Sequence, residues 1–440
     1  MPQPLASWLR KSSPAAFTIF ASLAGFATYF SMYAFRKPFA AAGFEHVQGW
    51  HFVLDFKATI VIAQVMGYAA SKFIGIKVIA EMRSAGRARA ILGLIGVSWI
   101  ALVLFAVAPA PVKVAAMFGN GLCLGMIWGL VFSYMEGRRS SEVLGAVLCA
   151  SFIVSSGAVK SVGLLLMSHV QVPMFWMPAA TGLAFAPVLL LGVWGLSSLP
   201  PPSADDERAR AKRAPMTGRE VRSFLAEYGV GVALLVSTYV FATALRDFRD
   251  NFAAELWGAL GYSDPAAVFT SAELPVAAVA LFAMAVVVKV RDNRRALAVI
   301  QIMILGGLFL LGASTLAFEA GWLGPLAWMI ASGAGLYVVY TPFNAMLFDR
   351  LVAVSGRVAN AGFLIYVADS AGYAGSCALV IWRNLGLKQL PWLSVFKDAI
   401  YAMSLMGAAL VILSLIYFNG RARSAALNLP STAAEVPGSP

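Results

Sequence analysis

The chain has 440 residues, of which 60% are hydrophobic and only 12% are charged, so its composition lies outside the range of soluble globular proteins. Apolar runs of membrane-spanning length fill nearly the whole sequence, which excludes a separate soluble domain and predicts a polytopic helical membrane protein. The formal net charge is +12, but Lys and Arg gather in alternate short loops. That pattern indicates membrane topology, and we expect no nucleic-acid partner.

The apolar runs, bounded by charges or turn residues, predict about twelve transmembrane helices. The first run is too long for a signal-peptide core and no small-residue cleavage site follows it, so we expect it to be retained. The alternation of basic loops places both termini in the cytoplasm, and we expect a bacterial inner membrane. The helices are predicted near residues 15–42, 54–80, 89–109, 112–135, 143–168, 173–198, 228–258, 265–289, 296–317, 321–348, 358–382 and 396–418.

A polar interval at residues 200–227 divides the chain into two halves. It reads as a solvated cytoplasmic linker between an N-terminal six-helix bundle, residues 1–199, and a C-terminal six-helix bundle, residues 228–420. Residues 421–440 are small and polar, which predicts a disordered cytoplasmic tail. Duplicated six-helix halves commonly place a binding site between them, near the middle of the bilayer.

A tyrosine and an arginine recur with the same spacing in the first helix of each half. A cation inside a membrane span costs about 2.5–3.5 kcal/mol on insertion scales, so each arginine needs an anion. Asp247 or Asp250 could supply it locally, but the repetition in both halves favours a bound anion, which a guanidinium can hold bidentately. The residues that share these helix faces are Tyr29, Tyr33 and Arg36 in the first helix, and Tyr239 and Arg246 in the seventh.

Three lysines also fall in apolar runs. Lys37 follows Arg36 about a quarter turn round the helix, and suits an ion pair as well as a substrate. Lys72 lies late in the second helix, where it could reach the membrane surface, but we favour a substrate role. Lys160 lies well inside the fifth helix, so it must meet an acid or help to hold an anion.

Two acids lie at membrane depth, Asp369 in the eleventh helix and Glu273 in the eighth. Each could pair with a cation or carry a proton, and for Asp369 we favour an internal ion pair. Arg249 and Asp250 stand one turn beyond Arg246, and we expect them to form a local salt bridge.

The sequence lacks several signals of other functions. His46, His51 and His169 fall in outer loops, which excludes a histidine relay or metal cluster inside the membrane. There is no P-loop and no constellation of catalytic residues, so we expect no ATP hydrolysis by this chain, no enzyme activity, no metal and no cofactor.

These motifs resemble those of the major facilitator superfamily, in particular the organophosphate:phosphate antiporters that carry glycerol-3-phosphate or hexose phosphates. Residues 36–39, RKPF, resemble the arginine–lysine motif of that family's first helix, and residues 71–73, SKF, resemble its second helix. Arg246 falls where the second phosphate-binding arginine is expected. The resemblance implies a fold of two pseudo-symmetric six-helix bundles in which Arg36 and Arg246 hold a phosphoryl group and Lys72 assists.

The chain departs from that family in three helices. The fourth helix lacks the expected paired prolines and arginine, the fifth carries Lys160 where the antiporters have a histidine, and an aspartate–tryptophan pair is missing from the seventh. We expect a monomeric secondary transporter that exchanges a phosphorylated metabolite for inorganic phosphate. The alternatives are a proton-coupled symporter of an organic acid, with Asp369 or Glu273 as the proton carrier, and a transporter-like sensor.

Overall fold

The computed structural model describes residues 3–427 except residues 83, 136–137, 139, 203–205, 207–217, 263–265, 356–360 and 387–388. Every regular element in this described part is a helix. In chain order the elements are α1 Gln3–Lys11, α2 Pro14–Tyr33, the 3-10 helix η1 Pro38–Ala41, α3 Phe56–Glu81, α4 Ser84–Val107, α5 Ala110–Leu124, α6 Ile127–Phe132, α7 Ser141–Ser168, α8 Met177–Ser197, α10 Gly218–Asn251, α11 Ala253–Ala259, α12 Ala266–Val288, α13 Asn293–Glu319, α14 Pro325–Ala345, α15 Leu347–Ser355, α16 Ala361–Gly386 and α17 Trp392–Leu427.

Within the described residues, twelve helical segments are long and apolar enough to cross a membrane. Two of these helices begin with a side-chain cap. Ser13 accepts the backbone N–H of Ala16 at 3.2 Å before α2, and Asp292 accepts that of Arg295 at 2.8 Å before α13. The predicted all-α integral membrane fold of about twelve spans is therefore confirmed.

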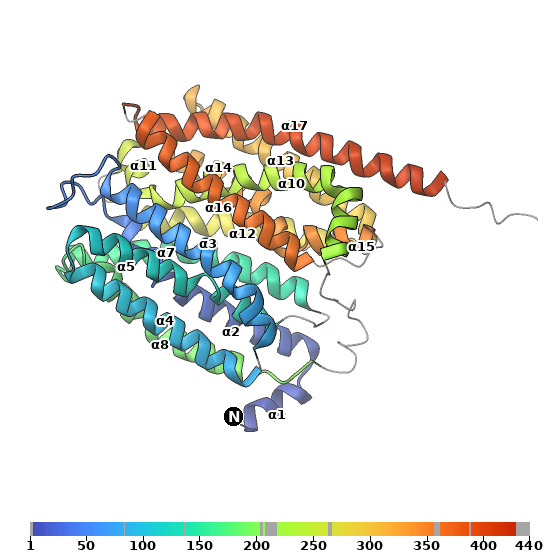
Figure 1. Ribbon diagram of the computed structural model, residues 1–440, viewed down its shortest axis with the longest axis horizontal. Coiled ribbons are helices and arrows are strands. Elements are labelled where there is room, and N and C mark those ends of the chain that lie inside the picture. The colour runs from blue at the N-terminus through green and yellow to red at the C-terminus, as the bar shows by residue number, and fades with distance from the viewer. Residues whose placement is uncertain are drawn as a thin grey trace, which may run out of the picture.

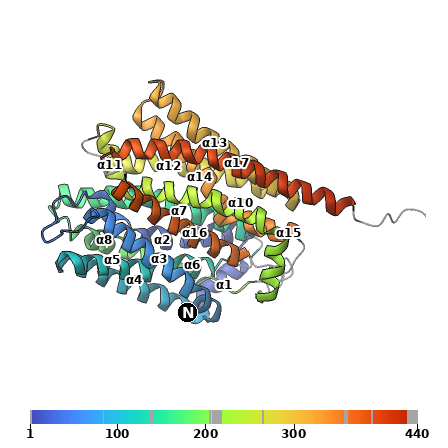
Figure 2. The same cartoon turned by 45° about the horizontal axis from the view of Figure 1, so that its top comes forward.

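The spans form two six-helix bundles that lie side by side. The N-terminal bundle runs from α2 to α8 and the C-terminal bundle from α10 to α17, and both views show them as separate layers (Figure 1, Figure 2). The bundles meet where α3 packs against α16 and where α7 packs against α12 and α14. The interface therefore places α3 and α7 opposite helices of the other half.

The first span of each bundle ends earlier than predicted and is followed by a short separate helix. The helix predicted at 15–42 ends at Tyr33, and η1 follows; the helix predicted at 228–258 is interrupted after Asn251, and α11 follows. Pro38 explains the first interruption, because it lacks an N–H and its ring would clash with the carbonyl four residues earlier, at Ala34, if the helix continued. The basic pair that precedes Pro38 therefore lies in a turn beyond the end of α2.

The linker predicted at 200–227 and the tail predicted at 421–440 lie partly outside the described residues, and their limits stay predictions. Where these segments are described, two helices run longer than expected. α10 begins at Gly218 and α17 continues to Leu427, since polar helix formers extend each helix beyond the apolar run that marks the membrane.

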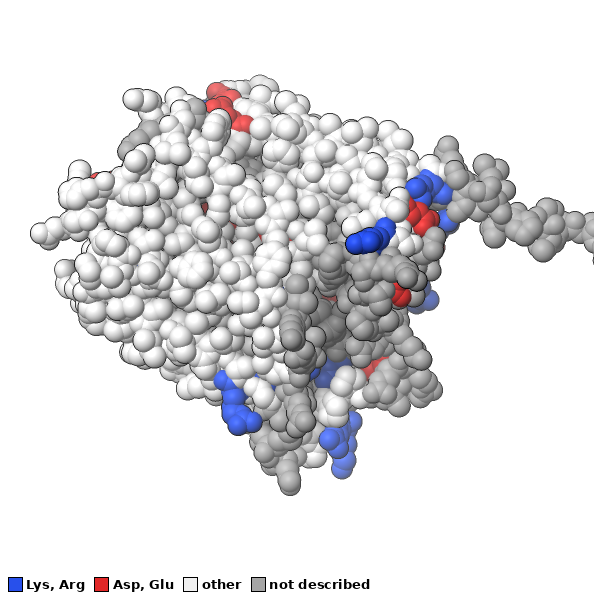
Figure 3. Space-filling view, viewed as in Figure 1, with Lys and Arg blue, Asp and Glu red and all other residues white. Residues whose placement is uncertain are grey.

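The basic side chains of one face gather along part of its rim. Figure 3 shows Lys and Arg at the right edge of the face in view, near the ends of α15 and α17, and at its lower edge, near α1, while the broad middle of that face is largely uncharged. Large apolar side chains such as Phe309 and Leu405 are exposed on the C-terminal bundle. Such a belt suits contact with lipid; the cytoplasmic orientation of the termini stays a prediction.

Within the N-terminal bundle, α3 and α5 approach each other at glycines. A Cβ atom at Gly121 would lie 2.0 Å from the carbonyl oxygen of Gln64, and one at Gly67 would lie 2.1 Å from that of Phe118. Only glycine, which has no side chain, permits two backbones to approach this closely. The approach fixes α3, which carries part of the site described below.

We expect Gly121→Val to lower the melting temperature of the purified protein, because forcing a side chain into a packed contact costs about 1–3 kcal/mol. Gly119→Val is the matched control, since a Cβ atom there has no neighbour within 4 Å and the position lies on the same helix. Thermal unfolding in detergent compares the two variants. Equal melting temperatures would contradict the close approach of α3 and α5.

Candidate functional site

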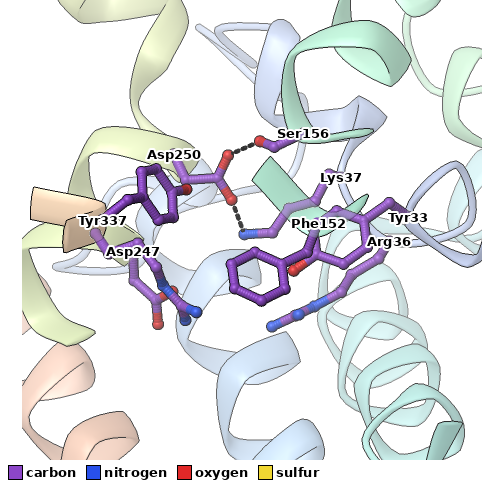
Figure 4. A pocket seen from close by; sticks show the side chains of 9 residues that line it. Tyr33, Arg36, Lys37, Phe152, Ser156, Asp247, Asp250 and Tyr337 are labelled. Atoms are coloured by element: carbon purple, nitrogen blue, oxygen red, sulfur yellow. Dashed lines mark hydrogen bonds and ion pairs between the residues drawn. The ribbon is translucent and has the colours of Figure 1, made fainter. Parts of the chain in front are cut away.

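A polar pocket lies between the two bundles, at the ends of α2 and α10 (Figure 4). The side chains fill it so closely that no room for a water molecule remains between them. A ligand of any size therefore requires the bundles or the side chains to move apart. The lining residues are Tyr33, Arg36, Lys37, Phe152 and Ser156 from the N-terminal bundle, and Arg246, Asp247, Asp250 and Tyr337 from the C-terminal bundle.

Arg36 is the cation in this pocket that no carboxylate neutralises. It is 3% exposed, and it makes no ion pair with any residue that the structure describes. Its guanidinium carbon lies 3.8 Å from the ring centroid of Tyr68 and 5.7 Å from that of Tyr33, and its Nε has no hydrogen-bond partner. Aromatic faces attract the charge, by about 2 kcal/mol when desolvated, but they do not cancel it.

Two buried amides hold the backbone at this position. Gln64 Nε2 donates to the carbonyl of Arg36 at 2.9 Å, and Asn120 Nδ2 donates to the carbonyl of Phe35 at 2.9 Å. Gln64 also donates to Asn120 Oδ1 at 2.8 Å. These amides satisfy carbonyls that the end of α2 leaves free. Gln64 and Asn120 were not predicted to have this role, although an amide within an apolar span is a signal for it.

Arg246 has a carboxylate partner. Its Nη2 lies 2.6 Å from Asp247 Oδ1, and its guanidinium carbon lies 4.3 Å from the ring centroid of Tyr340. The second oxygen of Asp247 is buried without a hydrogen-bond partner. The two arginines therefore differ: the one in the C-terminal bundle is neutralised locally and the one in the N-terminal bundle is not.

Asp250 joins the two bundles. It extends from α10 and lies 2.5 Å from Lys37 Nζ and 2.5 Å from Lys160 Nζ, and it accepts a hydrogen bond from Ser156. Lys37 also donates to Asn251 Oδ1 at 2.8 Å. These three donors to the Asp250 carboxylate come from the N-terminal bundle, so their contacts hold the two bundles together at the pocket.

The predicted local salt bridge between Arg249 and Asp250 is wrong. Arg249 Nη1 instead lies 2.6 Å from Glu273 Oε1 of α12. Neighbouring residues on a helix point about 100° apart and do not face each other, so Arg249 turns into its own bundle and Asp250 turns across the interface.

A second ion pair crosses the interface between α3 and α16. Lys72 Nζ lies 2.5 Å from Asp369 Oδ2, and Tyr239 donates its hydroxyl to Asp369 Oδ1 at 2.5 Å. The tyrosine stacks on Tyr340, which in turn contacts the guanidinium of Arg246. This cluster is therefore adjacent to the pocket without lining it.

The structure thus separates the predicted residues into two groups. Those that line the pocket are Tyr33, Arg36, Lys37, Arg246 and Asp247. Those that lie around it, in contact with its lining residues or in neighbouring polar clusters, are Tyr29, Lys72, Lys160, Tyr239, Glu273 and Asp369. Phe152, Ser156, Asp250 and Tyr337 complete the lining and were not predicted to bind substrate. Asp250 was predicted only as an ion-pair partner, and the position of Ser156 one turn before Lys160 was a sequence signal.

The pocket and its direct partners carry a surplus of positive charge. Four cations, Arg36, Lys37, Lys160 and Arg246, face two carboxylates among the described residues, which leaves a net charge of two positive units, because Lys37 and Lys160 share Asp250 and Arg36 has no carboxylate. The neighbouring Lys72–Asp369 and Arg249–Glu273 pairs are each neutral. A buried surplus of this kind is expensive unless an anion enters.

We expect Lys72→Met and Asp369→Asn each to lower the melting temperature of the protein, because each leaves a buried charge unpaired at a cost of about 3–5 kcal/mol. The double variant removes both charges and should recover most of the loss. A double-mutant cycle of thermal stability measures the coupling. Additive losses would contradict a direct pair across the interface.

No curated protein matches the sequence. Solved structures do match its fold. The crystal structure of a D-xylose–proton symporter superposes with a TM-score of 0.60 and 16% identity, over 92% of this chain and 97% of that one. The human organic anion transporter MFSD10 (TETRAN) superposes with a TM-score of 0.57 and 14% identity, over 92% of this chain and 100% of that one.

These similarities confirm the predicted major-facilitator-type fold of two pseudo-symmetric bundles. Because the identities are low, they establish the architecture alone. At the level of sequence, the family of unknown function DUF5690 matches residues 38–421, and the protein therefore belongs to that family.

Proposed function

We propose that this protein is a secondary transporter that moves a small anionic solute across the membrane by alternating access. The observation that carries the proposal is Arg36, a buried guanidinium in an interface pocket without a carboxylate of its own. Both structural neighbours are transporters by name, a D-xylose–proton symporter and an organic anion transporter, which supports the same class of function here.

The charge of the pocket favours a solute with about two negative charges. A phosphate monoester carries close to two at neutral pH and offers three acceptor oxygens, which suits two guanidinium groups. A monocarboxylate would leave one buried charge uncompensated. We therefore propose a phosphorylated metabolite, exchanged for inorganic phosphate, as the solute pair.

The arginines come from opposite bundles, which suggests how binding and movement are linked. An anion held by Arg36 and Arg246 together draws the N-terminal and C-terminal bundles towards each other. The empty site lacks this attraction, so the solute stabilises the closed state relative to the open ones. A gradient of the solute then drives transport.

We expect Arg36→Lys and Arg246→Lys each to reduce transport about 10- to 100-fold, because lysine keeps the charge but loses bidentate contacts. Arg383→Lys is the matched control: Arg383 is also buried, 3.6 Å from the ring centroid of Trp392, but lies outside the pocket. Uptake of labelled phosphate into proteoliposomes measures the effect. Wild-type flux in Arg36→Lys would refute the proposal.

A proton-coupled symporter of an organic acid is the second candidate. The observation in its favour is Asp369, which bridges the bundles through Lys72 and is 1% exposed. Protonation of this carboxylate would release the lysine, which would couple a proton to movement of the bundles.

Counterflow in proteoliposomes distinguishes the two candidates. Exchange predicts that labelled phosphate enters only when phosphate or a phosphate ester is present inside, and that an uncoupler has no effect. Symport predicts that a labelled organic acid enters vesicles that contain no internal anion, and that an uncoupler abolishes this uptake. Binding of phosphate without any flux would instead indicate a sensor.

A further inference from the structure

A second cavity lies away from the interface, between α13, α15 and α17. Its volume is about 70 Å³, which exceeds the roughly 10–15 Å³ that one water molecule needs. Its lining is mostly apolar, and the polar residues in it are Arg294, Gln301 and Asn419.

Gln301 is the unusual member of this lining. Its side chain is fully buried, at 0% exposure, and neither its amide oxygen nor its amide nitrogen has a hydrogen-bond partner. A buried amide that pairs with nothing costs about 1–3 kcal/mol per group. A ligand oxygen can accept a hydrogen bond from its amide nitrogen, and a water molecule in the cavity can donate one to its amide oxygen.

Arg294 gives the cavity a cationic mouth. It is exposed, makes no ion pair among the described residues, and lies seven residues before Gln301, so both side chains fall on one face of α13. The segment 289–295 also exposes Lys289, Arg291 and Arg295. Gln301 lies about 12 Å from the start of α13, at 1.5 Å per residue. The site therefore extends about 12 Å along α13, from a basic surface to a buried amide.

Exposed apolar side chains lie further along α13 and α17, beyond the cavity. Ile302 and Phe309 of α13 are 58% and 77% exposed, and Leu413 and Ile416 of α17 are 53% and 63% exposed. An acyl chain can lie against such a surface, whereas a free phosphate ion would gain nothing from it.

We propose that this cavity binds the polar end of an anionic phospholipid, with its phosphate at Arg294, a glycerol ester carbonyl at Gln301, and an acyl chain along α13 and α17. A cation, an unpaired buried amide and an apolar flank in this order match the polarity of such a lipid from headgroup to tail. The proposal is independent of the anion site between the bundles.

Native mass spectrometry of the detergent-purified full chain tests it, with phosphatidylglycerol and phosphatidylcholine as probes. We expect the wild type to retain one phosphatidylglycerol in preference to phosphatidylcholine. Arg294→Ala should weaken that retention about fivefold, the usual effect of one basic residue near an anionic headgroup. Arg295→Ala, the adjacent exposed arginine that does not line the cavity, should leave retention unchanged.

Gln301→Leu separates binding from folding. It removes the unpaired amide, so the melting temperature without lipid should hold or rise while retention of phosphatidylglycerol falls. Equal retention by wild type, Arg294→Ala and Gln301→Leu would overturn the proposal, as would a wild type that retains no lipid, which would identify a cavity filled by water alone. Displacement of the lipid by inorganic phosphate at equal concentration would identify a free-anion site and would also overturn it.

Discussion

A single buried guanidinium constrains the arrangement of the polar interior. Arg36 lies beyond the end of α2, where Pro38 stops the helix, and the amides of Gln64 and Asn120 hold the carbonyls of that turn. The interruption directs the arginine over the ring of Tyr68 at the interface between the bundles. Its charge is therefore kept out of water without a carboxylate partner in the described part of the chain, a state that an incoming anion would relieve.

The other charges at the pocket and around it are paired, and the pairs have two different roles. Arg246 with Asp247 and Arg249 with Glu273 lie within the C-terminal bundle, so they are unaffected if the bundles separate. The contacts of Asp250 and Asp369 cross the interface and must break for the bundles to part. A transporter of this fold would therefore exchange bonds between its halves for bonds to solute and water in each cycle.

Sequence reasoning located the arginines better than their partners. The repeated spacing of tyrosine and arginine identifies Arg36 and Arg246 because a charge in an apolar run is visible without any tertiary information. The partner of Lys160 was not visible, since Asp250 lies 90 residues further along the chain and in the other bundle. The salt bridge predicted between Arg249 and Asp250 was wrong, because adjacent residues on a helix point in different directions. The predicted ends of the helices at 15–42 and 228–258 were wrong, because a turn lies within each of these runs.

Fold and substrate are separate questions in this architecture. The D-xylose–proton symporter superposes on this chain and, by its name, carries a neutral sugar, whereas the organic anion transporter superposes about as well. The same two-bundle frame thus serves solutes of different charge, and the side chains that line the interface must set the preference. In this chain four cations face two carboxylates at the pocket and its direct contacts. A neutral solute would leave that surplus buried in the closed state, while an anion would cancel it, which is why the proposed solute follows from the charges and not from the fold.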